Sequence, residues 1–163
     1  MKTSLAIFVL FLGVSGFAAM PAVNDFSRFD GIATLNGTSV AFTIETRTTS
    51  FDSVLGIYGV THSTTIPGKP SKNEISRVAA KDMVTTAQVT DILKNCLQYN
   101  GNLETLNLKA GKFDTCRLPW SGKDMKGFIW VGMAPYGFVQ MDQTNRNGQR
   151  VVSKLESYVF GAP

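Results

Sequence analysis

The chain contains two cysteines, Cys96 and Cys116, and their pairing is the strongest constraint on its fold. An even number of cysteines favours a disulfide when a chain is exported to an oxidising compartment. Closing a loop of about twenty residues stabilises the folded state by about 3 kcal/mol in the chain-entropy model. The alternatives are a thiol nucleophile or a zinc site, but zinc needs about four ligands and the chain has a single histidine. We therefore expect a disulfide and no metal site.

The N-terminal segment has the features of a signal peptide in the expected order. Lys2 gives a short positive start, residues 5–12 (LAIFVLFL) form an uninterrupted apolar run, and the small residues Gly16 and Ala18 follow. The run is much shorter than the ~20 residues that span a bilayer. The segment is therefore predicted to direct export and to be removed.

Cleavage after Ala18 fits the peptidase rule, and cleavage after Ala22 is the alternative. We interpret residues 1–18 as the signal peptide and residues 19–163 as a single β-rich domain, periplasmic or extracellular. About 145 residues are enough for one hydrophobic core. No later apolar run is long enough to cross a bilayer, so no transmembrane segment is expected in the mature chain.

The charge pattern does not indicate a nucleic-acid partner. The formal charge of +4 falls to +3 on removal of residues 1–18, because they contain Lys2 and no acidic residue. The basic residues alternate with acids and hydroxyls, and they form no stripe interleaved with aromatics. This pattern is typical of a solvated surface.

The first half of the mature chain is predicted to be β-structure. Residues 39–50 (SVAFTIETRTTS) alternate between apolar and polar, which is typical of a half-buried strand. Asn36-Gly37 accepts the positive φ of a type I′ hairpin turn before this strand. Asn36-Gly37-Thr38 is also an N-glycosylation pattern, but the turn explains the same residues. A further strand is expected within residues 54–65, a loop at residues 67–73, and either a strand or a helix at residues 74–83.

Residues 87–99 predict one helix, with apolar side chains three and four positions apart. These are Val89, Ile92, Leu93, Cys96 and Leu97. Thr85 or Thr86 can cap its start, and Asn100-Gly101 provides a left-handed end. Cys96 lies on the buried face of this helix. The disulfide is therefore expected to join the helix to a strand beneath it.

The remainder predicts an antiparallel meander with short connections. The strand candidates are residues 103–109, 112–118, 127–133, 137–143 and 149–160. Residues 127–133 (GFIWVGM) carry large apolar side chains on both faces. We therefore expect this strand to be central and covered on both sides, with the helix on one of them.

The C-terminal half resembles a pattern in uncharacterised bacterial exported proteins, a domain of unknown function. The pattern has a cysteine, a glycine turn, a G-x-F-x-T-C segment, a Trp-bearing strand and P-x-G-x-V. Its parts are Cys96, Asn100-Gly101, residues 111–116 (GKFDTC), Trp130 and residues 135–139 (PYGFV). The resemblance covers roughly residues 93–161.

These proteins are similar in outline to envelope lipid-carrier half-barrels, in which a curved antiparallel sheet wraps a helix. The resemblance thus implies an α+β, mostly β fold: a half-barrel or meander packed on one main helix. It supplies no catalytic residue that can be carried over.

The titratable residues do not assemble a recognisable catalytic or cofactor site. His62 is the only histidine, so histidine-based acid–base chemistry would have to use it. Its neighbour Ser63 does not indicate catalysis, because neighbouring residues in a strand point to opposite faces. The carboxylates are scattered singly, although two distant ones can pair in space as in a glycosidase. We therefore expect no catalytic residues, no cofactor and no enzymatic activity, with a hydrolase as the second alternative function.

Aromatic and methionine side chains are dense in the C-terminal meander, and such residues suit adaptable apolar pockets. The candidate ligand-binding residues are Phe113, Phe128, Trp130, Met133, Tyr136, Phe138 and Met141. The same residues can instead fill a closed core. The primary hypothesis is an exported, non-enzymatic envelope protein that binds a lipid or other apolar or amphipathic ligand. The first alternative is an interaction or structural protein with an envelope or extracellular partner.

Overall fold

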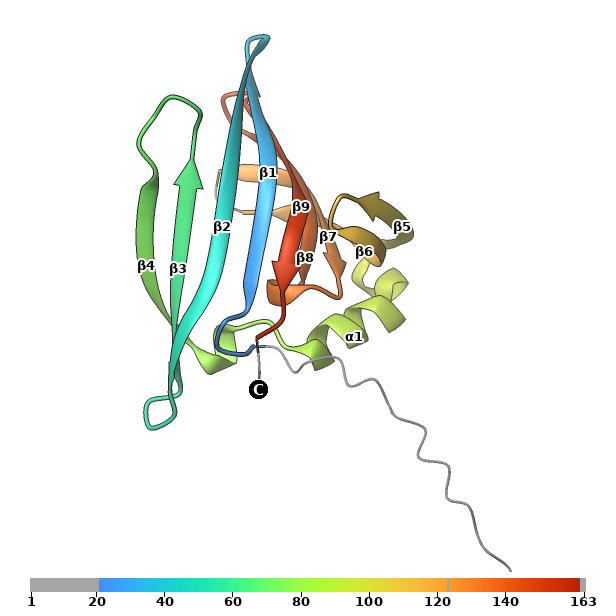
Figure 1. Cartoon of the computed structure of the whole chain (residues 1–163). Helices are drawn as coiled ribbons and strands as arrows, with labels where there is room; N and C mark the ends of the chain where they lie inside the picture. Colours follow the sequence, from blue (N-terminus) through green and yellow to red (C-terminus); the bar gives the residue numbers. More distant parts are fainter. Residues whose placement is uncertain (1–20, 123, 162–163) are drawn as a thin grey trace, which may run out of the picture.

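A computed structural model describes residues 21–122 and 124–161 (Figure 1). The predicted signal peptide, residues 1–18, and the cleavage after Ala18 lie outside the described residues. The strands are β1 (Phe26–Leu35), β2 (Thr38–Asp52), β3 (Ile57–Thr65), β4 (Lys72–Ala79), β5 (Asn102–Leu108), β6 (Gly111–Ser121), β7 (Met125–Gly132), β8 (Phe138–Asn145) and β9 (Arg150–Val159). The helices are η1 (Ala80–Asp82), α1 (Thr86–Lys94), η2 (Cys96–Tyr99) and η3 (Pro135–Gly137).

The strands form one open antiparallel sheet of nine strands within the described residues, in the order β4-β3-β2-β1-β9-β8-β7-β6-β5. Figure 1 shows the sheet curving from β4 round to β5, with α1 at one end of it. The predicted fold class, a mostly β α+β fold with a curved antiparallel sheet on one main helix, is confirmed. No helix in the described part of the chain is long and apolar enough to span a membrane.

The predicted hairpin turn at Asn36-Gly37 is confirmed. Both residues have positive φ, at 49° and 77°, and Leu35 pairs with Thr38 across the turn. The ambiguous segment at residues 74–83 contains both kinds of structure. It continues β4 to Ala79 and then forms the 3₁₀ helix η1.

The predicted helix begins as expected and tightens before its end. Thr85 and Gln88 form a capping box at its start, and Asn100 adopts the left-handed conformation at its end, with φ 56°. The α-helical part ends at Lys94, since Asn95 leaves the helical region with φ −111° and ψ 23°. Cys96 therefore begins the 3₁₀ helix η2 instead of continuing α1.

Strand β7 is covered on both faces, as its sequence predicts. Val131 packs against Val89 of α1, and the two residues form the centre of one apolar cluster. Neighbouring residues in a strand point to opposite faces, and Trp130 lies in a different cluster with Phe29 and Phe113. The strand therefore belongs to two apolar layers at once.

The predicted disulfide is present between Cys96 of η2 and Cys116 of β6, with a Cα–Cα distance of 5.6 Å. Both cysteines are buried. Gly101 lies against the bridge, because a Cβ there would come within 2.5 Å of the Cys116 sulfur. The disulfide therefore fixes the end of the helical segment to the sheet through a site that has no room for a side chain.

We expect replacement of both cysteines by serine to lower the free energy of unfolding by about 3 kcal/mol, because the unfolded chain regains the freedom of the closed loop. Urea unfolding of the Cys96→Ser/Cys116→Ser variant measures this loss. In a parallel assay, the denatured and unreduced wild-type chain should not react with a thiol reagent. Uptake of two equivalents would show that the bridge does not form.

Candidate functional site

The seven residues predicted to bind a ligand are divided among different parts of the described structure. Phe113 and Trp130 are buried in the cluster that also contains Phe29 and Leu155, and Phe138 packs against it. Met133 packs against the cluster under α1. None of the seven lines the groove that is described below. As a ligand site the set stays a prediction, and the geometry gives Phe113 and Trp130 a packing role.

The remaining residues of the seven, Tyr136, Phe128 and Met141, lie in different surroundings. The Tyr136 hydroxyl donates to the Asp25 carbonyl oxygen at 2.9 Å and contacts the Thr48 hydroxyl at 3.1 Å, and burial raises the pKa of Tyr136 to about 12. Phe128 is 42% exposed and packs beside Trp130 and under the Arg117 guanidinium. Met141 is half-buried on β8.

A groove of about 710 Å³ lies elsewhere, over β9, β1, β2 and the end of β3; we call it the β1 groove. The β1 side chains that line it include those of Arg28, Asp30 and Ile32, on the face of the strand opposite to the buried Phe29. The residues used in the argument below are Arg28, Asp30, Ile32, Ala41, Arg150, Val152 and Lys154. Sequence reasoning missed this groove.

The middle of the β1 groove is an apolar row across three strands. Ile32 of β1 pairs in register with Val152 of β9 on one side and with Ala41 of β2 on the other. Cross-strand neighbours on one face have Cβ atoms about 5 Å apart, so the three side chains form a continuous strip. Ile32 is 51% exposed, which leaves the strip open to a ligand.

Charged residues lie along both sides of the apolar row. On one side of the apolar row, two residues along the strands from Ile32 and Val152, Asp30 pairs with Lys154. On the other side, also two residues away, Thr34 pairs with Arg150. Arg150 is held by Asp142, with its Nη2 2.6 Å from Oδ2 and its Nε 2.9 Å from Oδ1. Among the described residues no carboxylate forms an ion pair with Lys154. The groove therefore offers one unpaired ammonium beside an apolar strip.

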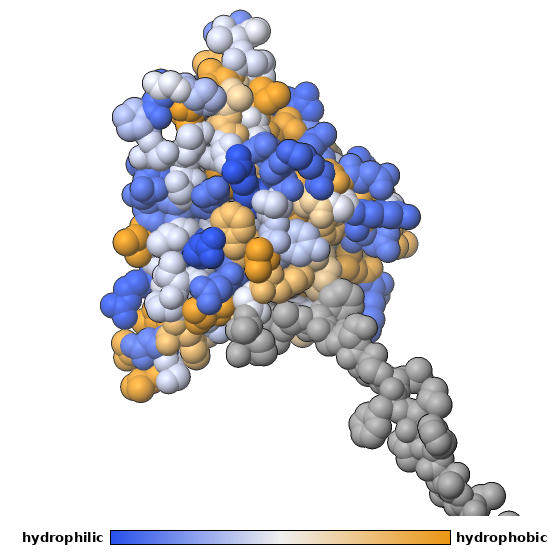
Figure 2. Space-filling view, viewed as in Figure 1, coloured by the Kyte–Doolittle hydropathy of each residue, from blue (hydrophilic) through white to orange (hydrophobic). Residues whose placement is uncertain are grey.

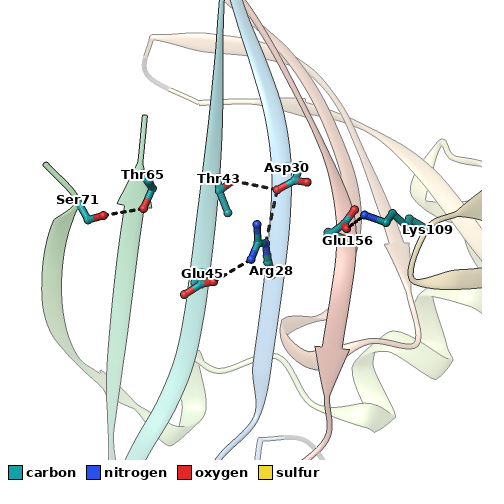
Figure 3. A network of polar contacts seen from close by, with 8 residues as sticks. All are labelled: Arg28, Asp30, Thr43, Glu45, Thr65, Ser71, Lys109 and Glu156. Carbon is teal, nitrogen blue, oxygen red and sulfur yellow. Dashed lines mark hydrogen bonds and ion pairs between the residues drawn. The ribbon is translucent and has the colours of Figure 1, made fainter. Parts of the chain in front are cut away.

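Arg28 organises the polar side of the groove (Figure 3). Its Nε lies 3.7 Å from Asp30 Oδ1 and its Nη1 3.6 Å from Glu45 Oε1, while the Thr43 hydroxyl donates to Asp30 at 3.0 Å. The Arg28 Nε atom is shielded from solvent and has no hydrogen-bond partner in the described part of the chain. The two carboxylates are thus bound to a shared cation.

The remaining candidates for chemistry are dispersed. His62 of β3 contacts the Thr46 hydroxyl through Nδ1 at 3.1 Å, and its register partner on β4 is Glu74. Both thiols are consumed in the disulfide. In residues 21–122 and 124–161, no three histidine, cysteine or acidic side chains are placed to hold a metal ion.

The sequence does contain a signal for the β1 groove. Along β1 (FSRFDGIATL) the residues Arg28, Asp30 and Ile32 alternate with Phe29 and Gly31. One face therefore combines charge with exposed apolar surface while the other is buried. The pattern becomes informative only once β9 is known to lie beside β1 and to contribute Val152 and Lys154.

No protein-family model matches the chain, and no curated protein sequence matches it. A solved structure from Bacteroides fragilis NCTC 9343, designated an exported protein with a YmcC-like fold, matches with a TM-score of 0.50 and 14% identity. The match covers 85% of this chain and 96% of that one. This likeness shows a shared fold.

Two further structures match less closely. A protein of Parabacteroides distasonis ATCC 8503, designated a lipoprotein, has a TM-score of 0.49 and 10% identity over 85% of this chain and 96% of that one. A chain in the MucA/MucB complex of Pseudomonas aeruginosa has a TM-score of 0.43 and 12% identity. That match covers 86% of this chain and 53% of the other.

Proposed function

We propose that this chain is an exported, non-enzymatic binding protein that holds an amphipathic ligand with an anionic group in the β1 groove. The observation that carries this proposal is the apolar row Val152–Ile32–Ala41 beside the unpaired Lys154, in a groove of about 710 Å³. A volume of this size fits a small ligand or one acyl chain. The fold shared with an exported B. fragilis protein is consistent with the proposed export.

The arrangement of charge favours an anionic over a cationic head group. Among the described residues, Asp30 is the one carboxylate that lines the groove, and its Oδ1 already contacts Thr43 and Arg28. Lys154, opposite Asp30 in the register, retains its donors, because an ammonium carries three of them. A carboxylate or phosphate on the ligand would pair with Lys154 while its apolar part covers Ile32 and Val152.

Binding is favoured over hydrolysis by the position of Arg28. A glycosidase-type pair of carboxylates must face one substrate from two sides, with one acting as acid and the other as base or nucleophile. Asp30 and Glu45 both contact the Arg28 guanidinium, so a fixed cation accompanies the pair. This arrangement suits a structural ion network better than proton transfer.

We expect Val152→Asp to weaken binding of a long-chain fatty acid roughly tenfold or more, because it places a charge in the apolar row. Lys154→Gln should weaken the same fatty acid about two- to fivefold, as expected for a solvent-exposed ion pair. The matching fatty alcohol should be bound almost equally by wild type and Lys154→Gln. Isothermal titration of each probe below its micelle concentration measures these differences.

The matched control is Ile75→Asp, because Ile75 is 80% exposed on β4 and does not line the groove. This variant should bind the fatty acid like wild type. Native mass spectrometry of the purified chain adds a direct test for a carried lipid. If wild type binds neither probe and carries no lipid, or if all variants bind alike, the groove proposal is wrong and an interaction role is favoured.

A further inference from the structure

The turn between β2 and β3 carries apolar side chains where a soluble hairpin usually has polar ones. We call residues 51–56 the β2–β3 tip. Val54 is 91% exposed, Leu55 59% and Phe51 43%. Figure 1 shows the tip projecting at one end of the sheet, and Figure 2 shows hydrophobic surface over it at the lower left. Adjacent apolar residues with this exposure indicate a contact surface.

The tip is held in a defined conformation. Asp52 Oδ1 accepts hydrogen bonds from the backbone N–H groups of Val54 and Leu55, each at 3.0 Å. The Gly56 carbonyl accepts from the Ala80 N–H at 2.8 Å, and Phe51 stacks on Tyr58 with ring centroids 4.4 Å apart. These bonds satisfy three backbone groups of the tip that would otherwise need water. The tip can therefore enter an apolar medium at a reduced cost in desolvation.

The start of the described chain lies next to the base of the same hairpin. The Tyr58 hydroxyl donates to the Pro21 carbonyl oxygen at 3.2 Å. In sequence, the apolar run at residues 5–12 precedes Pro21 by a connection of residues 13–20. That connection reaches at most about 28 Å when extended. If residues 5–12 are the apolar core of the predicted signal peptide, the connection to Pro21 would keep the tip within reach of the bilayer until cleavage.

From the exposed apolar tip, its hydrogen-bonded Val54 and Leu55 N–H groups and the short connection to residues 5–12, we propose that the β2–β3 tip is a membrane-contact wedge that inserts Val54 and Leu55 into a lipid surface. After removal of the signal peptide, the contact becomes a reversible association through the tip alone. It is separate from the β1 groove, which is lined by no residue of the tip. A protein partner at the tip is the competing outcome.

Vesicle flotation tests the proposal directly. The purified exported chain is mixed with vesicles of phosphatidylethanolamine and phosphatidylglycerol and separated by density. We expect wild type to float, and Val54→Asp/Leu55→Asp to reduce the floated fraction at least tenfold. Because both side chains are exposed, this variant should unfold at the same temperature as wild type. The control Ile75→Asp, at an apolar position on β4 that is 80% exposed, should float like wild type.

A second reporter measures insertion. With Val54→Trp, tryptophan emission should move to shorter wavelength on addition of vesicles and be quenched by brominated lipid, whereas Ile75→Trp should show neither change. Failure of wild type to float, equal flotation of the tip variant, or an unquenched Val54→Trp overturns the proposal. Val152→Asp distinguishes the two functions, since it should lose fatty-acid binding and still float.

Discussion

Replacing Trp130 by alanine is expected to lower the free energy of unfolding by roughly 3–5 kcal/mol, in the range for buried aromatic residues. Trp130 is 7% exposed and packs in the cluster with Phe29 and Phe113, so its removal leaves a cavity in the centre of β7. Its indole Nε1 also donates to Glu104 Oε2 at 3.0 Å. Glu104 retains an ion pair with Arg117, which limits the loss from the hydrogen bond alone. Urea unfolding monitored by circular dichroism measures the change.

His62→Ala is the comparison for Trp130→Ala. His62 is half-buried and shares a hydrogen bond with the Thr46 hydroxyl, so its replacement should cost below about 1 kcal/mol. Trp130→Phe should fall between the two, because it keeps most of the packing and loses the donor. Equal losses for Trp130→Ala and His62→Ala would show that the centre of the core is not at β7.

Asp25→Ala should cause a loss of similar size, roughly 2–6 kcal/mol, through hydrogen bonds instead of packing. The Asp25 side chain is 1% exposed. Its Oδ2 accepts from the Ala22 N–H and its Oδ1 from the Gly161 N–H, both at 2.8 Å. Alanine would leave two buried donors without acceptors, each of which costs about 1–3 kcal/mol. Thermal and urea unfolding of the purified variant measure the loss.

The control for Asp25→Ala is Asp124→Ala. Asp124 forms an exposed ion pair with Arg146 at 3.6 Å, and such pairs contribute below about 1 kcal/mol. Asp25→Asn should also lower the free energy of unfolding, although asparagine has nearly the same shape as aspartate. Its amide nitrogen is a donor and would face one of the two backbone N–H donors. If Asp25→Ala is as stable as Asp124→Ala, the carboxylate does not join the two ends of the domain.

The elements predicted correctly from the sequence are those with a local cause. Asn36-Gly37 determines its own turn, and the 3.6-residue period with Thr85 and Asn100 determines the helical segment. The disulfide is predicted from the expected export and from the number of cysteines. In each case the information lies within a few residues, or in a pair with no competing partner.

The pairing of β1 with β9 has no such local signal. Phe26 pairs with Val159, and neither strand carries a residue that selects the other over several similar strands. Because this pairing creates the β1 groove, the groove could not be predicted from the sequence either. The aromatic density around Trp130 indicated apolar burial correctly, but aromatic side chains in a core and in a pocket give the same sequence pattern.

The position of β1 also determines when the molecule can finish folding. β1 is the first strand of the described chain, and its second neighbour, β9, is the last. If a chain of this topology crosses a membrane through a narrow channel from its N-terminus, β9 is the last strand to emerge. Until then β1 can pair on one side only, and the Asp25 carboxylate lacks its bond to Gly161. Such long-range pairing slows folding, so a chain exported in this way would complete its sheet only after β9 has crossed the membrane.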